Sequence, residues 1–115
     1  MTVKRIVANI ASDPIDEVKQ FYVDLFDLEI VMDLGWIATL SSVESAAVQI
    51  SIACEGGSGT EVPDFSIEVD DLDAVYQRAQ NQGLTIEYKL TDEPWGVRRF
   101  YVRDPAGKLL NILSH

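Results

Sequence analysis

The sequence predicts a single α+β domain in which two βαβββ modules form curved mixed sheets around a cup. The first observation is a repeat in which an aspartate and two apolar residues recur at one constant spacing: Asp13, Ile15 and Val18, then Asp70, Leu72 and Val75. The second is the same alternation of strand-like and helix-like hydrophobic periods in both halves. The third is a pairing of tryptophan with glycine between the second and third strands of each half. A repeat of this length indicates a duplicated structural unit.

The first module is expected over residues 1–55, beginning with a strand at residues 5–11 that alternates apolar and polar side chains. Asp13 suits the N-cap of the helix that follows, and Pro14 suits its first position. Phe21 and Tyr22 lie on a stripe with helical spacing, so we expect both in the core. The remaining strands are expected at residues 29–33, 36–40 and 47–53.

A glycine-rich hinge is expected over residues 56–60, because Gly-Gly-Ser-Gly is typical of flexible linkers. The second module then covers residues 61–115. Asp71 suits the N-cap of its helix, and Gly83 suits the left-handed position after the helix ends. The strands of this module are expected at residues 64–69, 84–90, 97–103 and 108–113.

The last two strands form a hairpin around Asp104-Pro105-Ala106-Gly107, a sequence typical of a tight turn. Strand alternation places Phe100 and Val102 on one face and Arg99 and Tyr101 on the other. The return strand has one polar interior residue, Asn111. We expect Asn111 on the face of Arg99 and Tyr101, which should stay polar and open.

Composition excludes several classes of function. The formal net charge is −10, from 19 acidic and nine basic residues. This charge argues against nucleic acid and anionic membranes as partners, and it is compatible with a cationic ligand, although acidity first of all confers solubility. Cys54 is the only cysteine, so neither an intrachain disulfide nor a cysteine-rich zinc site is possible. No signal peptide or run of bilayer length is present, and we expect a cytoplasmic protein.

The hairpin resembles that of the vicinal oxygen chelate superfamily, which includes glyoxalases, extradiol dioxygenases and bleomycin-resistance proteins. The resemblance rests on Pro94-Trp95-Gly96, the Asp-Pro-x-Gly turn and the strand after it. Residues 21–26 and 69–73 are also similar to family sequences, and the duplicated unit extends the resemblance over the whole chain. It implies that members commonly form homodimers, and we expect one here.

The resemblance also implies where a metal would bind. Enzymes of the family hold one divalent cation through His, Glu or Gln on the first and last strands of each half. The matching positions here are Val7 or Ile6, Gln49 or Ser51, Asp64, and Asn111. This set has no imidazole and one carboxylate, and the only histidine, His115, is at the terminus. Divalent cations require better donors, so we expect no metal and no other cofactor.

The leading hypothesis is a non-enzymatic, metal-free protein that sequesters a small molecule, similar to the bleomycin-resistance branch. A tryptophan can stack on a planar ligand or hold a cation over its ring, so the expected ligand is planar or cationic. The candidate ligand-binding residues are Asn9, Trp36, Gln49, Trp95, Arg99, Tyr101 and Asn111.

Structural interpretations of these residues stay open. Asn111 can be a satisfied buried amide, Trp95 a turn residue, Trp36 a core residue, and Arg99 the partner of an acidic side chain. Two other functions also stay open. One is a metal-dependent lyase or dioxygenase with an atypical site at Gln49, Asp64 and Asn111. The other is a dimerising interaction module that binds no ligand.

Overall fold

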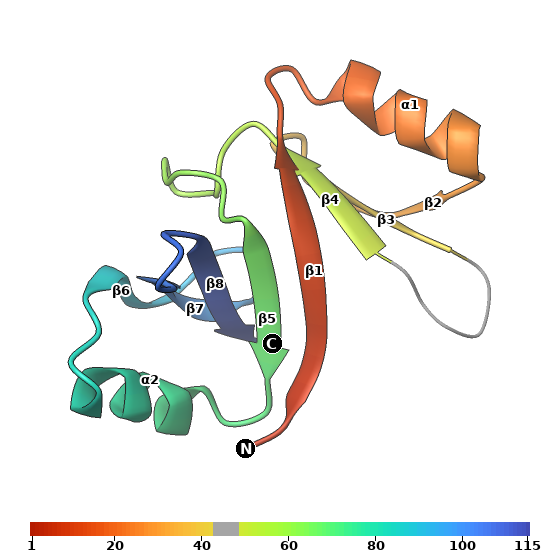
Figure 1. Ribbon diagram of the computed structural model, residues 1–115. Helices are drawn as coiled ribbons and strands as arrows, with labels where there is room; N and C mark the ends of the chain where they lie inside the picture. Colours follow the sequence, from red (N-terminus) through yellow and green to blue (C-terminus); the bar gives the residue numbers. More distant parts are fainter. Residues whose placement is uncertain (43–48) are drawn as a thin grey trace. The chain divides into compact units, whose positions relative to one another are not determined.

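A computed structural model describes residues 1–42 and 49–115 and confirms the α+β class (Figure 1). Mixed parallel and antiparallel pairing joins its strands. The elements are β1 (Val3–Ala11), α1 (Asp16–Phe26), β2 (Glu29–Asp33), β3 (Ile37–Ser41), β4 (Gln49–Ala53), β5 (Phe65–Val69), α2 (Leu72–Asn81), β6 (Ile86–Asp92), β7 (Arg98–Arg103) and β8 (Leu109–Ser114). The strand predicted at residues 47–53 begins outside the described residues, and its described part forms β4. No helix in the described ranges is long and apolar enough to span a membrane.

The chain divides into two compact units, which we describe separately. The first unit comprises residues 7–62, and the second comprises residues 1–6 together with 63–115. Strand β1 therefore contributes to both. The strand pairing repeats between them: the first strand runs parallel to the last, and the last runs antiparallel to the third, which pairs with the second. This shared topology confirms the predicted duplication.

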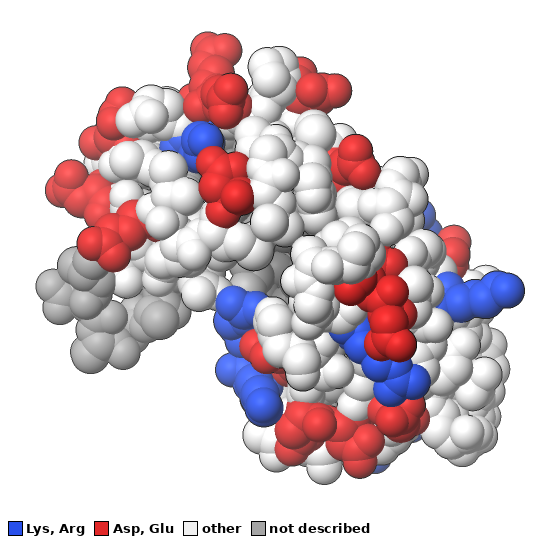
Figure 2. Space-filling view, turned by 180° about the vertical axis from the view of Figure 1, so that it is seen from behind, with Lys and Arg blue, Asp and Glu red and all other residues white. Residues whose placement is uncertain are grey.

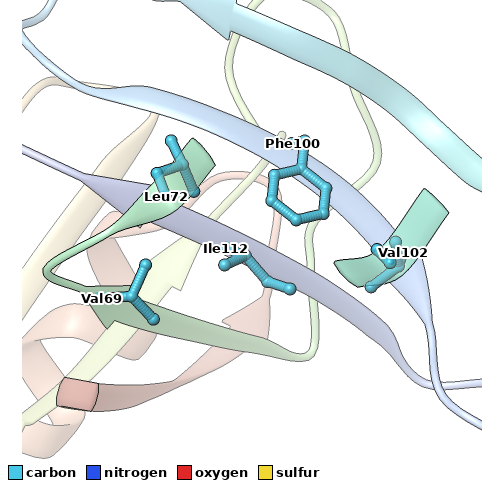
Figure 3. Packing of buried hydrophobic residues seen from close by; sticks show 6 residues of the cluster. Val69, Leu72, Phe100, Val102 and Ile112 are labelled. Carbon is cyan, nitrogen blue, oxygen red and sulfur yellow. The ribbon is translucent and has the colours of Figure 1, made fainter. Parts of the chain in front are cut away.

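The core of the second unit lies between α2 and one face of its sheet. Phe100 is completely buried and lies opposite Ile112 in the pairing of β7 with β8. Both side chains pack with Val102, with Val69 of β5 and with Leu72 of α2 (Figure 3). Successive strand residues point to opposite faces, so burial of Phe100 and Ile112 under α2 directs Tyr101 and Asn111 away from the helix.

The core of the first unit is smaller and corrects one prediction. Ile15, Leu40 and Ile52 are buried, and Tyr22 packs against this cluster. Phe21, in contrast, is 56% exposed, so its predicted place in the core is wrong. Val18 and Tyr22 are four residues apart and lie on the side of α1 that faces the core, whereas Phe21 lies at the edge of that side.

The two helices begin differently. In α2, the side chain of Asp71 accepts a hydrogen bond from the backbone N–H of Ala74 at 3.0 Å, as predicted for an N-cap. In α1, the N-cap is Ile15, without a side-chain cap, so the predicted helix start at Asp13 and Pro14 is wrong. Burial of Ile15 in the core fixes the chain at this point, and its carbonyl accepts a helical hydrogen bond from the N–H of Lys19 at 2.9 Å.

The predicted glycine-rich hinge forms a turn with its own hydrogen bonds. The backbone N–H of Gly56 donates to the carbonyl of Thr60 at 2.7 Å, and the N–H of Gly59 donates to the carboxylate of Glu55 at 3.1 Å. Gly57 and Gly59 have φ values of 85° and 74°, which glycine adopts without steric cost. Whether this turn acts as a hinge stays a prediction.

Phe100 and Phe21 make a matched test of the core assignments. Replacing Phe100 with alanine should lower the free energy of unfolding by about 3–5 kcal/mol, because it removes a buried ring and leaves a cavity. Phe21→Ala should lower it by less than about 1 kcal/mol, since that ring is largely in solvent. Urea unfolding followed by circular dichroism measures both, and equal losses would contradict the assignments.

The helix starts give a second matched pair. Asp71→Ala should cost about 1 kcal/mol of unfolding free energy, because the N–H of Ala74 loses its acceptor. Asp13→Ala should change it by less than about 0.5 kcal/mol, because Asp13 caps nothing. Thermal melts of the two variants and of the unmodified protein measure both changes. A larger loss of stability for Asp13→Ala than for Asp71→Ala would support the predicted helix start at Asp13.

Candidate functional site

The candidate site is the face of the second unit's sheet that points away from α2. Strand register places four side chains in one row across this face: Ser66 of β5, Asn111 of β8, Tyr101 of β7 and Tyr88 of β6. Directly paired residues point to the same face of a sheet, so these polar and aromatic groups are neighbours. Tyr101 is 2% exposed and Asn111 is 9% exposed. The predicted sharing of one face is confirmed, but these two side chains are buried rather than open.

Arg99, two residues before Tyr101, lies at the centre of an aromatic cluster. Its guanidinium carbon is 5.2 Å from the ring centroid of Tyr88, 5.0 Å from that of Trp95 and 4.9 Å from that of Tyr101. Each distance is within the range of a cation–π contact. The structure thus brings together three of the predicted ligand-binding residues, Trp95, Arg99 and Tyr101, with the cation supplied by the protein.

Glu93 balances the charge of Arg99. Its carboxylate is 3.2 Å from a terminal nitrogen of Arg99, and the hydroxyl of Tyr88 donates to its other oxygen at 2.7 Å. The side chains of Arg99 and Glu93 are only 3% and 1% exposed. The turn between β6 and β7 positions Glu93, whose N–H donates to the carbonyl of Val97 at 2.7 Å. The alternative that Arg99 pairs with an acidic side chain is therefore confirmed.

Asn111 provides the most informative polar atom of this face. Its amide nitrogen donates to the hydroxyl of Ser66 at 3.1 Å. Its Oδ1 is buried and has no hydrogen-bond partner within residues 1–42 and 49–115. A buried acceptor without a donor costs roughly 1–3 kcal/mol. Asn111 is thus a half-satisfied amide: the described residues supply a partner for its nitrogen and none for its Oδ1.

A second charged cluster lies at the end of the same sheet. Glu68 of β5 is 3.2 Å from Arg5 and 2.9 Å from His115, which places the terminal histidine in a defined contact. Burial by itself raises the pKa of Glu68, but the hydrogen bond from His115 and the positive charge of Arg5 outweigh it and lower that pKa below its ordinary value. This cluster joins β1 to β5 and to the end of the chain.

The other predicted ligand-binding residues belong to the first unit. Asn9 of β1 is half-buried and lies opposite Ser51, whose hydroxyl is 2.7 Å from that of Thr39. Gln49 lies opposite Ser41 on the same face, because it is two residues from Ser51 along β4. Trp36 is half-buried, and its carbonyl accepts the N–H of Cys54 at 2.9 Å. For all three, ligand binding stays a prediction.

The four positions that match the family's metal ligands do not fit a divalent cation. Val7 is a buried hydrocarbon. The carboxylate of Asp64 accepts the backbone N–H of Leu109 at 2.8 Å and helps to hold β5 against β8. Gln49 and Asn111 add only neutral amides, whereas such cations favour carboxylate and imidazole donors. Nowhere in the described part of the chain do three His, Cys, Asp or Glu side chains gather as a metal site would require.

Sequence reasoning missed Glu93, Tyr88 and Ser66. Strand β6 contains two register irregularities, so its pattern of alternation does not reveal that Tyr88 faces Tyr101. Glu93 is one of 19 acidic residues, and nothing in its neighbourhood distinguishes it from those in solvent. Ser66 has a weak signal, since it alternates with Phe65 and Ile67 in the predicted strand.

The buried pair of Arg99 and Glu93 should be strongly coupled. Glu93→Leu should lower the free energy of unfolding by about 3–5 kcal/mol, because it leaves Arg99 buried without its counter-charge. The double variant Glu93→Leu with Arg99→Leu should recover much of that loss. Asp73→Asn, which alters the exposed pair with Arg98, should cost less than about 1 kcal/mol. Urea unfolding of the unmodified protein, Glu93→Leu, Arg99→Leu and the double variant measures the coupling, with Asp73→Asn as the exposed control, and strictly additive losses would contradict it.

Solved structures similar to this chain share its fold. A glyoxalase/bleomycin resistance protein/dioxygenase superfamily member from Vibrio splendidus 12B01 has 21% identity and a TM-score of 0.69, with 99% of this chain and 100% of that one covered. A structure named NAD-dependent benzaldehyde dehydrogenase from Legionella pneumophila has 16% identity and a TM-score of 0.75, covering 96% and 98%. Methylmalonyl-CoA epimerase from Mycobacterium tuberculosis has 17% identity and a TM-score of 0.64, covering 97% and 86%.

The family assignment rests on the sequence itself. No curated protein matches this chain. The family profile of the glyoxalase/bleomycin resistance protein/dioxygenase superfamily, in contrast, matches residues 5–112 and so spans both units. The chain belongs to the glyoxalase/bleomycin resistance protein/dioxygenase superfamily.

Proposed function

We propose that this chain is a metal-free protein that binds and sequesters a small molecule, and that it is not an enzyme. The observation that carries the proposal is Asn111, a neutral amide at a position where the family's enzymes hold a metal. Its Oδ1 is buried without a hydrogen-bond partner in the described residues. We further propose that the protein is a homodimer, as its family resemblance suggests, and that it is located in the cytoplasm.

The surroundings of Asn111 support a ligand that donates a hydrogen bond. A donor from the ligand offsets the cost of the buried acceptor, which is roughly 1–3 kcal/mol. Tyr101, next to Asn111 in the row, is an aromatic neighbour of this acceptor. An apolar wall with a few converging polar groups is the usual construction of a small-molecule site.

The contacts of Trp95 narrow the expected class of ligand. The guanidinium of Arg99 lies over its ring at 5.0 Å, so a cationic ligand stacked on that side of the ring competes with a cation that the fold already supplies. Between the planar and the cationic classes, this contact favours a planar, neutral compound with an N–H or O–H donor.

Benzamide and two analogues can test this proposal. In a Trp36→Phe background, Trp95 is the only tryptophan and reports on its surroundings. Benzamide should change its fluorescence, while N,N-dimethylbenzamide, which lacks the donor, should bind about tenfold more weakly. Benzamidinium, the cationic analogue, should also bind more weakly. Asn111→Leu should reduce benzamide binding about tenfold, whereas Asn81→Leu, a change at the end of α2, should leave it unchanged.

A melting scan with nickel, zinc, manganese and iron(II) separates the proposal from a metal-dependent lyase or dioxygenase. The melting temperature should respond to none of these ions selectively, because a ligand raises it only by binding the folded state. A rise with one ion that Asp64→Ala abolishes would overturn the metal-free proposal in favour of an enzyme. Equal binding of benzamide and its dimethyl analogue would overturn the role of Asn111.

A further inference from the structure

Nearly all of the net negative charge of this protein belongs to one of its two units. Residues 7–62 contain one basic residue, Lys19, and ten acidic residues, so this unit carries −9 of the net charge of −10. The other unit has eight basic and nine acidic residues and is almost neutral. Figure 2 shows acidic side chains gathered at the upper left of the view, over the part of the chain that contains α1.

The same unit exposes large apolar side chains on α1 and β2. On α1 these are Phe21, Leu25 and Phe26, which are 56%, 60% and 58% exposed. On β2, Ile30 and Val31 are 45% and 53% exposed, and no residue of this strand is buried. We refer to these five side chains as the apolar face.

Acidic residues lie among those of the apolar face in the sequence, and an ion pair joins its helix to its strand. Lys19 of α1 is 2.9 Å from Asp33 of β2, which holds the helix beside the strand. Strand β2 is the outermost strand of its sheet, because it pairs within the described residues only with β3. Asp24, Asp27 and Glu29 are exposed between or beside the apolar side chains. Exposed apolar clusters of this kind mark interaction sites.

We propose that the apolar face binds a polypeptide segment that carries both basic and apolar side chains. Charge complementarity selects this occupant, since the acidic residues attract Lys and Arg while the apolar side chains gain from burial. If a second copy of the chain occupied this face, two acidic units, each with a net charge of −9, would meet there, and like charges disfavour that contact. Anionic membranes are repelled for the same reason. This inference is independent of the ligand proposed at Asn111.

Three synthetic peptides of 14 residues test the charge and apolar requirements separately. One contains only Leu and Lys, one only Leu and Glu, and one only Ser and Lys. Fluorescence anisotropy with the full chain should show binding of the Leu/Lys peptide that weakens at least tenfold between about 50 and 500 mM salt. The Leu/Glu peptide should not bind, and the Ser/Lys peptide should bind about tenfold more weakly than Leu/Lys.

Matched variants locate the site. Phe21→Ser with Leu25→Ser should weaken Leu/Lys binding about tenfold, whereas Leu84→Ser, which changes a 41% exposed leucine of the other unit, should have no effect. Asp24→Asn with Asp27→Asn should weaken binding several-fold. Asp73→Asn with Glu87→Gln removes the same amount of charge from the second unit and should not weaken binding.

Several outcomes would overturn the proposal. If the Leu/Lys peptide does not bind, the apolar face is not a site for such a segment. If all the variants weaken its binding equally, the acidic protein merely attracts cations. If sedimentation shows that Phe21→Ser with Leu25→Ser converts an oligomer to a monomer, a second copy occupies the apolar face. Binding of phosphatidylserine vesicles that the same double variant abolishes would assign the face to a membrane.

Discussion

Alternation of side chains along β7 and β8 is the constraint on which the second unit depends. Phe100 and Ile112 are paired across the two strands and buried beneath α2. A strand cannot bury these residues without sending the residues between them to the opposite face. The positions of Arg99, Tyr101 and Asn111 are therefore consequences of the core, and a shift of register by one residue would exchange the core with the candidate site.

Burial of charge follows from the same arrangement. Arg99 points into an aromatic cluster because its strand neighbours are fixed, and a buried guanidinium requires compensation. Glu93 supplies the opposite charge, and the hydroxyl of Tyr88 satisfies its second oxygen. This network surrounds Arg99 with three aromatic rings, while the Oδ1 of Asn111 stays without a partner in the described residues, which is why the proposed ligand is a donor rather than a cation.

Patterns of local sequence predicted much of the fold but less of the site. The duplication, the strands and the cap at Asp71 follow from periodicity and from residue preferences at turns. The start of α1 was not predicted correctly, because burial of Ile15 overrides the preference of Asp13 and Pro14 for a helix start. Phe21 shares a helical stripe with core residues, yet lies at its exposed flank. The pairing of Glu93 with Arg99 depends on a turn and on irregular register in β6, and neither has a periodic signature.

Broadening of amide signals by Mn²⁺ in two-dimensional ¹⁵N NMR tests the metal-free account most directly. With substoichiometric Mn²⁺, the account predicts loss of signal spread over the exposed acidic residues, with the side-chain amides of Asn111 and Gln49 retained. Selective and simultaneous loss of these two amide signals, before those of α1, would mean that one ion binds at the family's metal positions. That result would contradict the account.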